Sequence, residues 1–176
     1  MELDQRSAAR LALVREHVKG ENEHDLNAIM APFGETARYD DEPCSEHFVG
    51  HDAVREHYQD LFQAVPDLCV DVQREHMTHD GVVLEVVIRG THDGTWRGLP
   101  GTGRTVAVPL CGVFTFDAQD RLAGERVYYD RALVFRQLGV FHEPDTPLGQ
   151  ILTALTHPVT IARIAVRRLT RPPQKT

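Results

Sequence analysis

The sequence predicts an α+β fold in which N-terminal helices pack on a curved, mainly antiparallel sheet. Up to Pro66 the apolar residues recur at helical spacing, and beyond it they recur at the spacing of two that marks strands. Helices therefore come first and strands follow without helices between them, which is typical of α+β proteins. Such an arrangement predicts a cone-shaped, half-open barrel that encloses a pocket, followed by a C-terminal helical extension.

Three helices are expected before Pro66. The first covers residues 3–18 and ends at Gly20, the second covers residues 22–31, and the third runs from His51 to Pro66. A short extended piece is expected around residues 38–40.

Four antiparallel strands are expected after Pro66, and a helix over residues 131–138 follows them. The second strand places His92 on the same face as its apolar residues. Residues 105–117 are apolar on both faces, which fits a central strand or one whose outer face meets a partner subunit. Pro109 predicts an irregular or unpaired segment within that strand. In the fourth strand Arg126, Tyr128 and Asp130 share a face with Leu122.

Length and charge predict one main domain, residues 1–146, and a separate basic extension, residues 147–176. The 176 residues carry a net charge of −7, but residues 147–176 hold five basic residues and no acidic one. An acidic main domain repels phosphate backbones, so nucleic-acid binding is not expected.

The extension predicts two amphipathic helices, the second beginning at Pro158. A basic amphipathic helix can lie on an anionic membrane. Packing on the acidic domain or on a partner subunit is the favoured alternative, because an acidic surface is present on the same chain.

The cellular setting predicted by the sequence is the cytoplasm. The three cysteines have no C-x-x-C spacing, which argues against a disulfide framework or a thiolate zinc site. The N-terminus lacks the pattern of a secretory signal, and no run of about 18 apolar residues occurs.

Several motifs resemble the SnoaL-like polyketide cyclase or ester cyclase family of the nuclear-transport-factor-2-like superfamily. They are G-T-H-D-G-x-x-x-G-x-x-x-T-G-R, E-R-x-Y-Y-D, R-Q-L-G and P-D-L, and the resemblance covers roughly residues 10–140. It implies a cone-shaped α+β barrel, usually a homodimer, that uses no metal or organic cofactor. It also implies that Asp130 acts as acid and base in an intramolecular aldol ring closure.

Asp130 and His92 are the two catalytic candidates. If Asp130 faces a dry pocket, burial raises its pKa toward the range that a base needs. The structural alternative is a helix N-cap, because Asp130 immediately precedes the helix RALVFRQL. His92 could donate a hydrogen bond to a substrate carbonyl or relay a proton, or it could be a turn histidine bonded to backbone. Characterised cyclases of the family carry an assisting histidine on the strand before the aspartate, which reads VAVPLCGVFTF here; His92 or His76 would have to replace it.

Six further residues are predicted to bind a hydrophobic substrate. Aromatic side chains suit the walls of such a pocket, and an arginine could hold the aspartate ionised or bind an enolate. Core packing for Phe33 and Phe62, and a solvated position for Arg126, are the alternatives. The residues are Tyr39, Phe33, Phe62, Trp96, Arg126 and Tyr128.

Two other patterns are set aside. Residues 98–105 have the spacing of a phosphate-binding loop, but Arg104 replaces the lysine and a strand follows in place of a helix. His47 and His51 stand four apart, yet Gly50 interrupts any helix between them, so no metal site is predicted.

The predicted function is therefore a cofactor-independent acid/base enzyme acting on a hydrophobic carbonyl compound, with aldol-type polyketide cyclisation as its reaction. Dehydratases, isomerases and epoxide hydrolases of the same fold are alternatives, as is a non-catalytic module for small-ligand binding or dimerisation.

Overall fold

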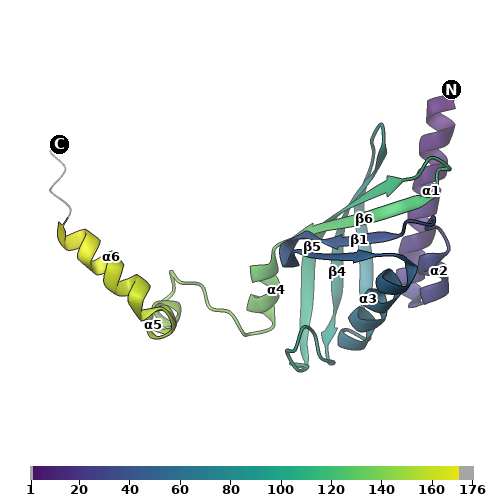
Figure 1. Ribbon diagram of the computed structural model, residues 1–176. Helices are drawn as coiled ribbons and strands as arrows, with labels where there is room; N and C mark the ends of the chain where they lie inside the picture. The colour runs from purple at the N-terminus through teal and green to yellow at the C-terminus, as the bar shows by residue number, and fades with distance from the viewer. Residues whose placement is uncertain (1, 171–176) are drawn as a thin grey trace. The chain divides into compact units, whose positions relative to one another are not determined.

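The computed structural model describes residues 2–170, which divide between Leu138 and Gly139 into two compact units. The first unit contains four α-helices, one short 3₁₀ helix and six strands (Figure 1). The helices are α1 (Glu2–Glu23), α2 (Leu26–Met30), η1 (Glu42–Cys44), α3 (His51–Ala64) and α4 (Arg131–Gln137). The strands are β1 (Arg38–Asp41), β2 (Glu46–Val49), β3 (Cys69–Met77), β4 (Gly81–His92), β5 (Arg104–Phe116) and β6 (Leu122–Tyr129).

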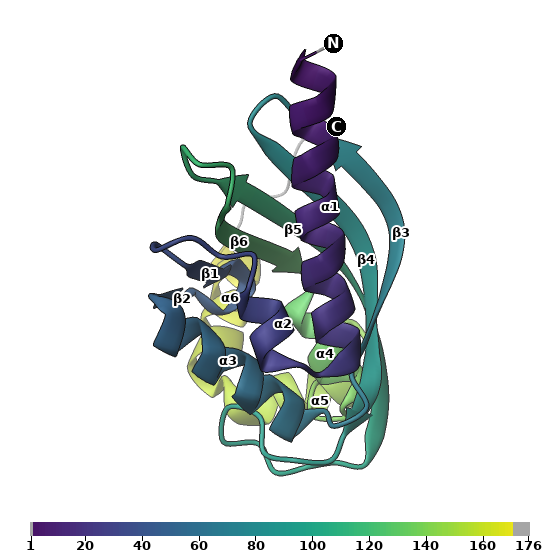
Figure 2. The ribbon, with the colours of Figure 1, turned by 90° about the vertical axis from the view of Figure 1, so that its right-hand side faces the viewer.

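The six strands form one curved sheet in the order β2-β1-β6-β5-β4-β3. Strands β3 to β6 form an antiparallel meander, and among the strand pairs of the described residues the β1–β6 pair is the parallel one. Helices α1, α2 and α3 lie on one side of this sheet (Figure 2). The predicted α+β class and the predicted order of helices and strands are confirmed, and the extended piece near residue 38 is β1, paired with a further strand, β2.

Helix α1 continues to Glu23, so the expectation that it ends at Gly20 is wrong. Gly20 instead allows the backbone of α2 to pack closely against α1. A Cβ atom at position 20 would lie 2.8 Å from the backbone nitrogen of Ile29, closer than real Cβ atoms come to other heavy atoms. Helix α2 then begins after Asp25, whose side chain accepts hydrogen bonds from the backbone N–H groups of Asn27 and Ala28. The continuous α1 places Glu21 one turn beyond His17 on the same helix.

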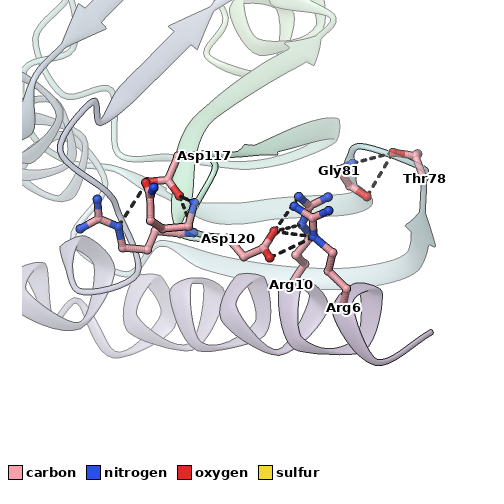
Figure 3. A network of polar contacts seen from close by, with 8 residues as sticks. Arg6, Arg10, Thr78, Gly81, Asp117 and Asp120 are labelled. Carbon is pink, nitrogen blue, oxygen red and sulfur yellow. Dashed lines mark hydrogen bonds and ion pairs between the residues drawn. The ribbon is translucent and has the colours of Figure 1, made fainter. Parts of the chain in front are cut away.

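The turn between β5 and β6 holds the N-terminal half of α1 in place. Asp120 accepts charge-assisted hydrogen bonds from Arg6 and Arg10, with nitrogen-to-oxygen distances of 2.8 and 2.7 Å (Figure 3). The guanidinium of Arg10 also lies over the ring of Phe116, 4.9 Å from its centre. These contacts fix the position of the helix that carries His17 and Glu21.

A β-bulge at the start of β6 reverses the alternation of its side chains. Phe116 pairs with Leu122 and Thr115 pairs with Gly124, which leaves Ala123 as an extra residue in β6. The extra residue moves every later side chain of β6 to the face opposite the predicted one. Leu122 remains buried at 0% exposure, but from Glu125 onward the odd-numbered residues face inward.

Helix α4 is attached to a part of β5 that extends beyond the end of β6. The side-chain amide of Gln137 accepts a hydrogen bond from the backbone N–H of Ala107 and donates one to its carbonyl, at 2.7 and 3.0 Å. Pro109, two residues further on, pairs with β4 only. The predicted irregularity at Pro109 therefore coincides with the end of the β5–β6 pairing.

The second unit contains α5 (Pro147–Thr156) and α6 (Pro158–Thr170). Both predicted helices are present, and Pro158 begins the second. Their apolar side chains are largely exposed within the unit, for example Leu155 at 72%. Residues 171–176 of the predicted extension lie outside the described residues. Packing of this extension on the domain or on a partner stays a prediction. Among the described residues there is no helix both long and apolar enough to cross a membrane.

Candidate active site

A cavity of about 140 Å³ lies within the first unit, between the helices and the concave face of the sheet. Most of its wall is aliphatic, contributed by α1, α3, α4 and strands β3 to β6. Seven ionisable or hydroxyl-bearing side chains interrupt this apolar wall: Glu21, Tyr39, Asp41, His57, His92, Glu125 and Tyr129. A mostly apolar pocket with a few converging polar groups is the usual form of a small-molecule site.

Two cavity-lining carboxyl groups belong to a buried network with His17 and Tyr58. The hydroxyl of Tyr58 donates a hydrogen bond of 2.6 Å to Oε2 of Glu125. Nε2 of His17 lies 3.2 Å from the same oxygen and 3.8 Å from Oε1 of Glu21. On the other side of its ring, Nδ1 of His17 donates to the carbonyl of Ile29 at 2.9 Å. Nε2 also lies 3.0 Å from the hydroxyl of Tyr58. For Nε2 to donate toward the carboxylates, the imidazole has to carry a second proton.

This network raises the pKa values of His17 and Glu21. Burial would lower the pKa of His17, but the hydrogen bond to Glu125 and the nearby carboxylate charges raise it to about 9. Burial raises the pKa of Glu21 to about 8; His17 opposes this rise and the charge of Glu125 adds to it. At neutral pH His17 is a cation and Glu21 is mainly a neutral acid facing an apolar cavity.

His92 lies at the end of β4 and is 2% exposed. Its Nδ1 faces Thr102, from whose hydroxyl it is 3.2 Å away. Its Nε2 is buried and has no hydrogen-bond partner within the described part of the chain. The predicted orientation of His92, toward the apolar face of its strand, is confirmed because the side chain lines the cavity.

His57, on α3, is a second lining residue with an unpartnered nitrogen. Its ring lies between those of Tyr39 and Phe48, with both centroid distances 4.3 Å. Burial lowers its pKa, so the ring is neutral at neutral pH. Nε2 is buried without a partner among the residues that the structure describes.

Asp130 lies outside the set of cavity-lining residues, and its predicted orientation and raised pKa are wrong. Its side chain is 54% exposed and caps α4 by accepting a hydrogen bond of 3.1 Å from the backbone N–H of Leu133. Arg136 donates to its other oxygen at 2.9 Å. The Leu133 N–H is the main cause that lowers the pKa of Asp130, and Arg136 adds to it. The bulge at Ala123 explains the error, because it turns this end of β6 outward.

The six predicted binding residues separate into three groups. Tyr39 and Trp96 line the cavity. Phe33 and Phe62 pack in the core, where their rings contact those of His17 and His24. Arg126 and Tyr128 lie on the outer face with Asp130. Arg126 pairs there with Asp40 and Glu42, and Tyr128 is 45% exposed. The positions of Phe33 and Phe62 in the core, and of Arg126 and Tyr128 on the outer face, do not support a role in binding a ligand in the cavity.

Three residues of the site, Glu21, His17 and Glu125, are not among those predicted from the sequence. A signal for the first two was present, because His17 and Glu21 follow Val14 and Val18 at helical spacing on the buried side of α1. Two ionisable residues on an apolar helix face are unusual and indicate a buried polar network. Glu125 had no such signal, since its inward position depends on the bulge.

His17, Glu21 and Glu125 are also the residues that could hold a metal ion. Their ligand atoms lie within 4.8 Å of one another, and they form the one such group among the described residues. The bond from Nδ1 of His17 to Ile29 would leave Nε2 as the ligand atom. A cation would have to displace the protons that His17 and Glu21 hold at neutral pH.

The fold and the cavity define a class of small α+β proteins that enclose a ligand site between helices and a curved sheet. The SnoaL-like polyketide cyclase model matches residues 11–138, and the chain belongs to this family. No curated protein matches the chain significantly.

Solved structures support the fold assignment. A protein from Jannaschia sp. CCS1, assigned as a SnoaL-like polyketide cyclase, is 19% identical, with 78% of this chain and 94% of that one covered and a TM-score of 0.67. A protein from Catenulispora acidiphila with a ketosteroid isomerase-like fold is 17% identical, with coverages of 73% and 93% and a TM-score of 0.63. SalBIII, an epoxide hydrolase/cyclase-like enzyme with a role in pyran ring formation in the polyether salinomycin, is 21% identical, with coverages of 70% and 92% and a TM-score of 0.60.

Proposed function

We propose that this chain is a cofactor-independent acid/base enzyme that closes a ring in a small hydrophobic carbonyl compound by an aldol reaction. The observation that carries this proposal is Glu21, a carboxyl group in an apolar cavity whose pKa is raised to about 8. General acid/base catalysis is most effective when the pKa of the catalytic group is close to the working pH. Asp130, with an exposed side chain and a lowered pKa, does not meet this requirement.

In the proposed reaction the ionised form of Glu21 removes a proton from a carbon next to a carbonyl group. The electron pair of the C–H bond moves to that carbonyl and forms an enolate, whose oxygen accepts a hydrogen bond from His92. The enolate carbon then bonds to a second carbonyl carbon of the same molecule. The oxygen of that carbonyl becomes an alkoxide and takes the proton back from Glu21, so no oxidant or reductant is consumed.

The apolar walls support this chemistry in two ways. They exclude water that would compete with the second carbonyl, and they hold a flexible substrate so that its reacting carbons meet. Glu125 accepts a hydrogen bond from Tyr58 and lies 3.2 Å from Nε2 of His17, beside Glu21. The charge of Glu125 helps to make Glu21 a stronger base than an ordinary carboxylate.

Epoxide opening is the second candidate, favoured by the protonated state of Glu21 at neutral pH. A neutral carboxylic acid in the cavity could protonate an epoxide oxygen as its C–O bond breaks, while a hydroxyl group of the substrate attacks the ring carbon. The proton of that hydroxyl group then returns to the carboxylate. The structural similarity to SalBIII agrees with this alternative at the level of the fold.

We also propose that the chain works as a homodimer through the outer face of the sheet. This face carries apolar side chains from β4 and β5, including Val83, Val87 and Val113, which are partly exposed in the single chain. Analytical ultracentrifugation checks this proposal, and a protein that sediments as a monomer at micromolar concentration contradicts it.

Deuterium exchange into cyclohexanone tests the proposed proton abstraction without knowledge of the natural substrate. In D₂O at pD near 8, the full chain should speed deuterium uptake at the two carbons beside the carbonyl. Addition of EDTA should leave the rate unchanged if no metal takes part. An exchange rate equal to that of buffer contradicts the acid/base proposal, and a rate abolished by EDTA contradicts cofactor independence.

A further inference from the structure

The glycine-rich segment that resembles the family motif has no role in the proton transfer proposed above. It begins at the end of β4 and returns to the start of β5, and Gly94, Gly101 and Gly103 each meet a specific structural need. A Cβ atom at Gly94 or Gly101 would collide with the backbone oxygen of Gln63 or Asp93, respectively. Gly103 has a φ of +64°, which glycine adopts without strain. The segment is therefore built to hold its two ends close together.

The two ends of this segment are joined by hydrogen bonds at His92. The backbone N–H groups of Thr102 and Gly103 both donate to the carbonyl of His92, each at 2.9 Å. The end of α3 supports the same corner, because the carbonyl of Ala64 accepts from Asp93 and Gly94 at 3.1 and 3.0 Å. The segment thus fixes the backbone of His92 from two sides.

The side chain of Thr102 fixes the ring of His92 as well. The backbone N–H of Thr102 donates chiefly to the carbonyl of His92 and lies 3.4 Å from Nδ1, so it is only a weak second donor to that nitrogen. The Thr102 hydroxyl lies 3.2 Å from Nδ1 and accepts from the N–H of Arg104 at 3.4 Å, so its own proton is free to be donated to Nδ1. A neutral imidazole whose Nδ1 accepts hydrogen bonds must carry its proton on Nε2.

We propose that Thr102 is a positioning residue that keeps His92 in the Nε2–H form, so that His92 donates a hydrogen bond to a carbonyl or enolate oxygen of the ligand. This inference rests on the proposed function for the identity of the acceptor, whereas the tautomer is inferred from the contacts of Nδ1 with Thr102 alone. Nε2 is buried in the wall of the cavity without a partner in the described chain, which is the position of a donor that a ligand satisfies. A donor fixed in advance toward the developing oxyanion needs no reorganisation during the reaction.

Two substitutions separate the hydroxyl from the rest of the side chain. Thr102→Val keeps the shape and removes the hydroxyl, whereas Thr102→Ser keeps the hydroxyl and removes a methyl group. Nitrogen-15 NMR of the imidazole rings in the full chain reports which nitrogen of His92 is protonated. We expect the Nε2–H form in the wild type and in Thr102→Ser, and a mixture of both tautomers in Thr102→Val. A wild-type ring protonated on Nδ1, or a Thr102→Val ring identical to the wild type, overturns the inference.

Exchange into cyclohexanone supplies the second readout. Thr102→Val should lower kcat for deuterium uptake about tenfold while KM changes less than threefold, because the lost effect falls on the enolate more than on the ketone. Thr102→Ser should restore at least half of the wild-type kcat. Equal losses in both variants indicate a merely structural role and overturn the proposal. If the tautomers behave as expected but no chain catalyses exchange, the proposed function fails and the assignment of Thr102 stands.

Discussion

Two carboxyl groups, Glu21 and Asp130, show how differently one fold can treat the same chemical group. Glu21 lies on a buried helix face, and burial raises its pKa to about 8. Asp130 ends a strand at the surface, and the backbone N–H of Leu133 lowers its pKa. A carboxylate that accepts hydrogen bonds from a helix N-terminus is stabilised as an anion, so it becomes a weaker base. The comparison favours Glu21, in the cavity, over Asp130, in the family motif, as the residue that transfers the proton.

The largest expected effect is a difference in activity between a variant of Glu21 and a variant of Asp130. Glu21→Gln and Asp130→Asn each replace a carboxylate by an amide of similar shape. We expect Glu21→Gln to lower the exchange of deuterium into cyclohexanone by about 100-fold or more, as loss of a general base does. Asp130→Asn should stay within about threefold of the wild type, because asparagine is also a good N-cap. Loss of activity in Asp130→Asn, with activity kept in Glu21→Gln, would reverse the assignment.

Stability should fall as the pH rises through the range in which the buried network loses its protons. His17 has a pKa raised from 6.5 to about 9, so its contribution is complete below pH 6.5 and is lost as the pH passes 9. Glu21 has a pKa raised from 4.5 to about 8, so its contribution is complete below pH 4.5 and is lost as the pH rises to 8. With about 3 kcal/mol from each group, the free energy of unfolding should decrease by about 6 kcal/mol between pH 6 and pH 10.

Urea unfolding at a series of pH values measures this decrease. Glu21→Gln supplies the control, because its amide is neutral at every pH and its curve should decline less. A stability that stays constant or rises between pH 6 and pH 9 is incompatible with the protonation states assigned to the network.

Tyr58→Phe should move the pH dependence of activity without removing activity. The hydroxyl of Tyr58 stabilises the ionised form of Glu21, so its loss raises the pKa of Glu21 further. The pH at which the exchange rate reaches half its maximum should increase by about 0.5–1 unit. The pH–rate profile with cyclohexanone measures this shift, and a shift to lower pH contradicts the effect of Tyr58 on the pKa of Glu21.

The smallest effect concerns Asp130 as a helix cap. Asp130→Ala removes the side-chain oxygen that accepts from Leu133, and we expect the melting temperature to fall by about 2–4 °C. Activity should remain close to that of the wild type. Differential scanning calorimetry provides the measurement, with Asp130→Asn as the variant that keeps the cap and should melt near the wild-type temperature.

The fold could be predicted because its signals are local and periodic. The change of spacing at Pro66 located the sheet, and the apolar face of β4 correctly placed His92 toward the pocket. The orientation of Asp130 could not be predicted from this periodicity. One bulged residue, Ala123, exchanges the two faces of β6, and the one local hint in the sequence LAGERVYYD is Gly124, because a glycine within a strand often accompanies a bulge.

The candidate site could be predicted only in part, because it is assembled from distant segments. Glu21 and Glu125 are 104 positions apart and meet only when α1 crosses the concave face of the sheet. The raised pKa of Glu21 comes from burial and from the charge of Glu125, and neither can be read from the residues beside Glu21 in the chain. The i,i+4 pair of His17 and Glu21 on an apolar helix face was the one local signal.

A direct measurement of the pKa of Glu21 tests the central claim. Carbon-13 NMR of glutamate carboxyl groups, recorded from pH 3 to pH 10 and assigned with Glu21→Gln, follows the ionisation of this residue alone. We predict that its carboxyl signal titrates with a midpoint near 8. A midpoint near the ordinary value of 4.5 would show that the cavity does not raise the proton affinity of Glu21, and would contradict its assignment as the catalytic acid and base.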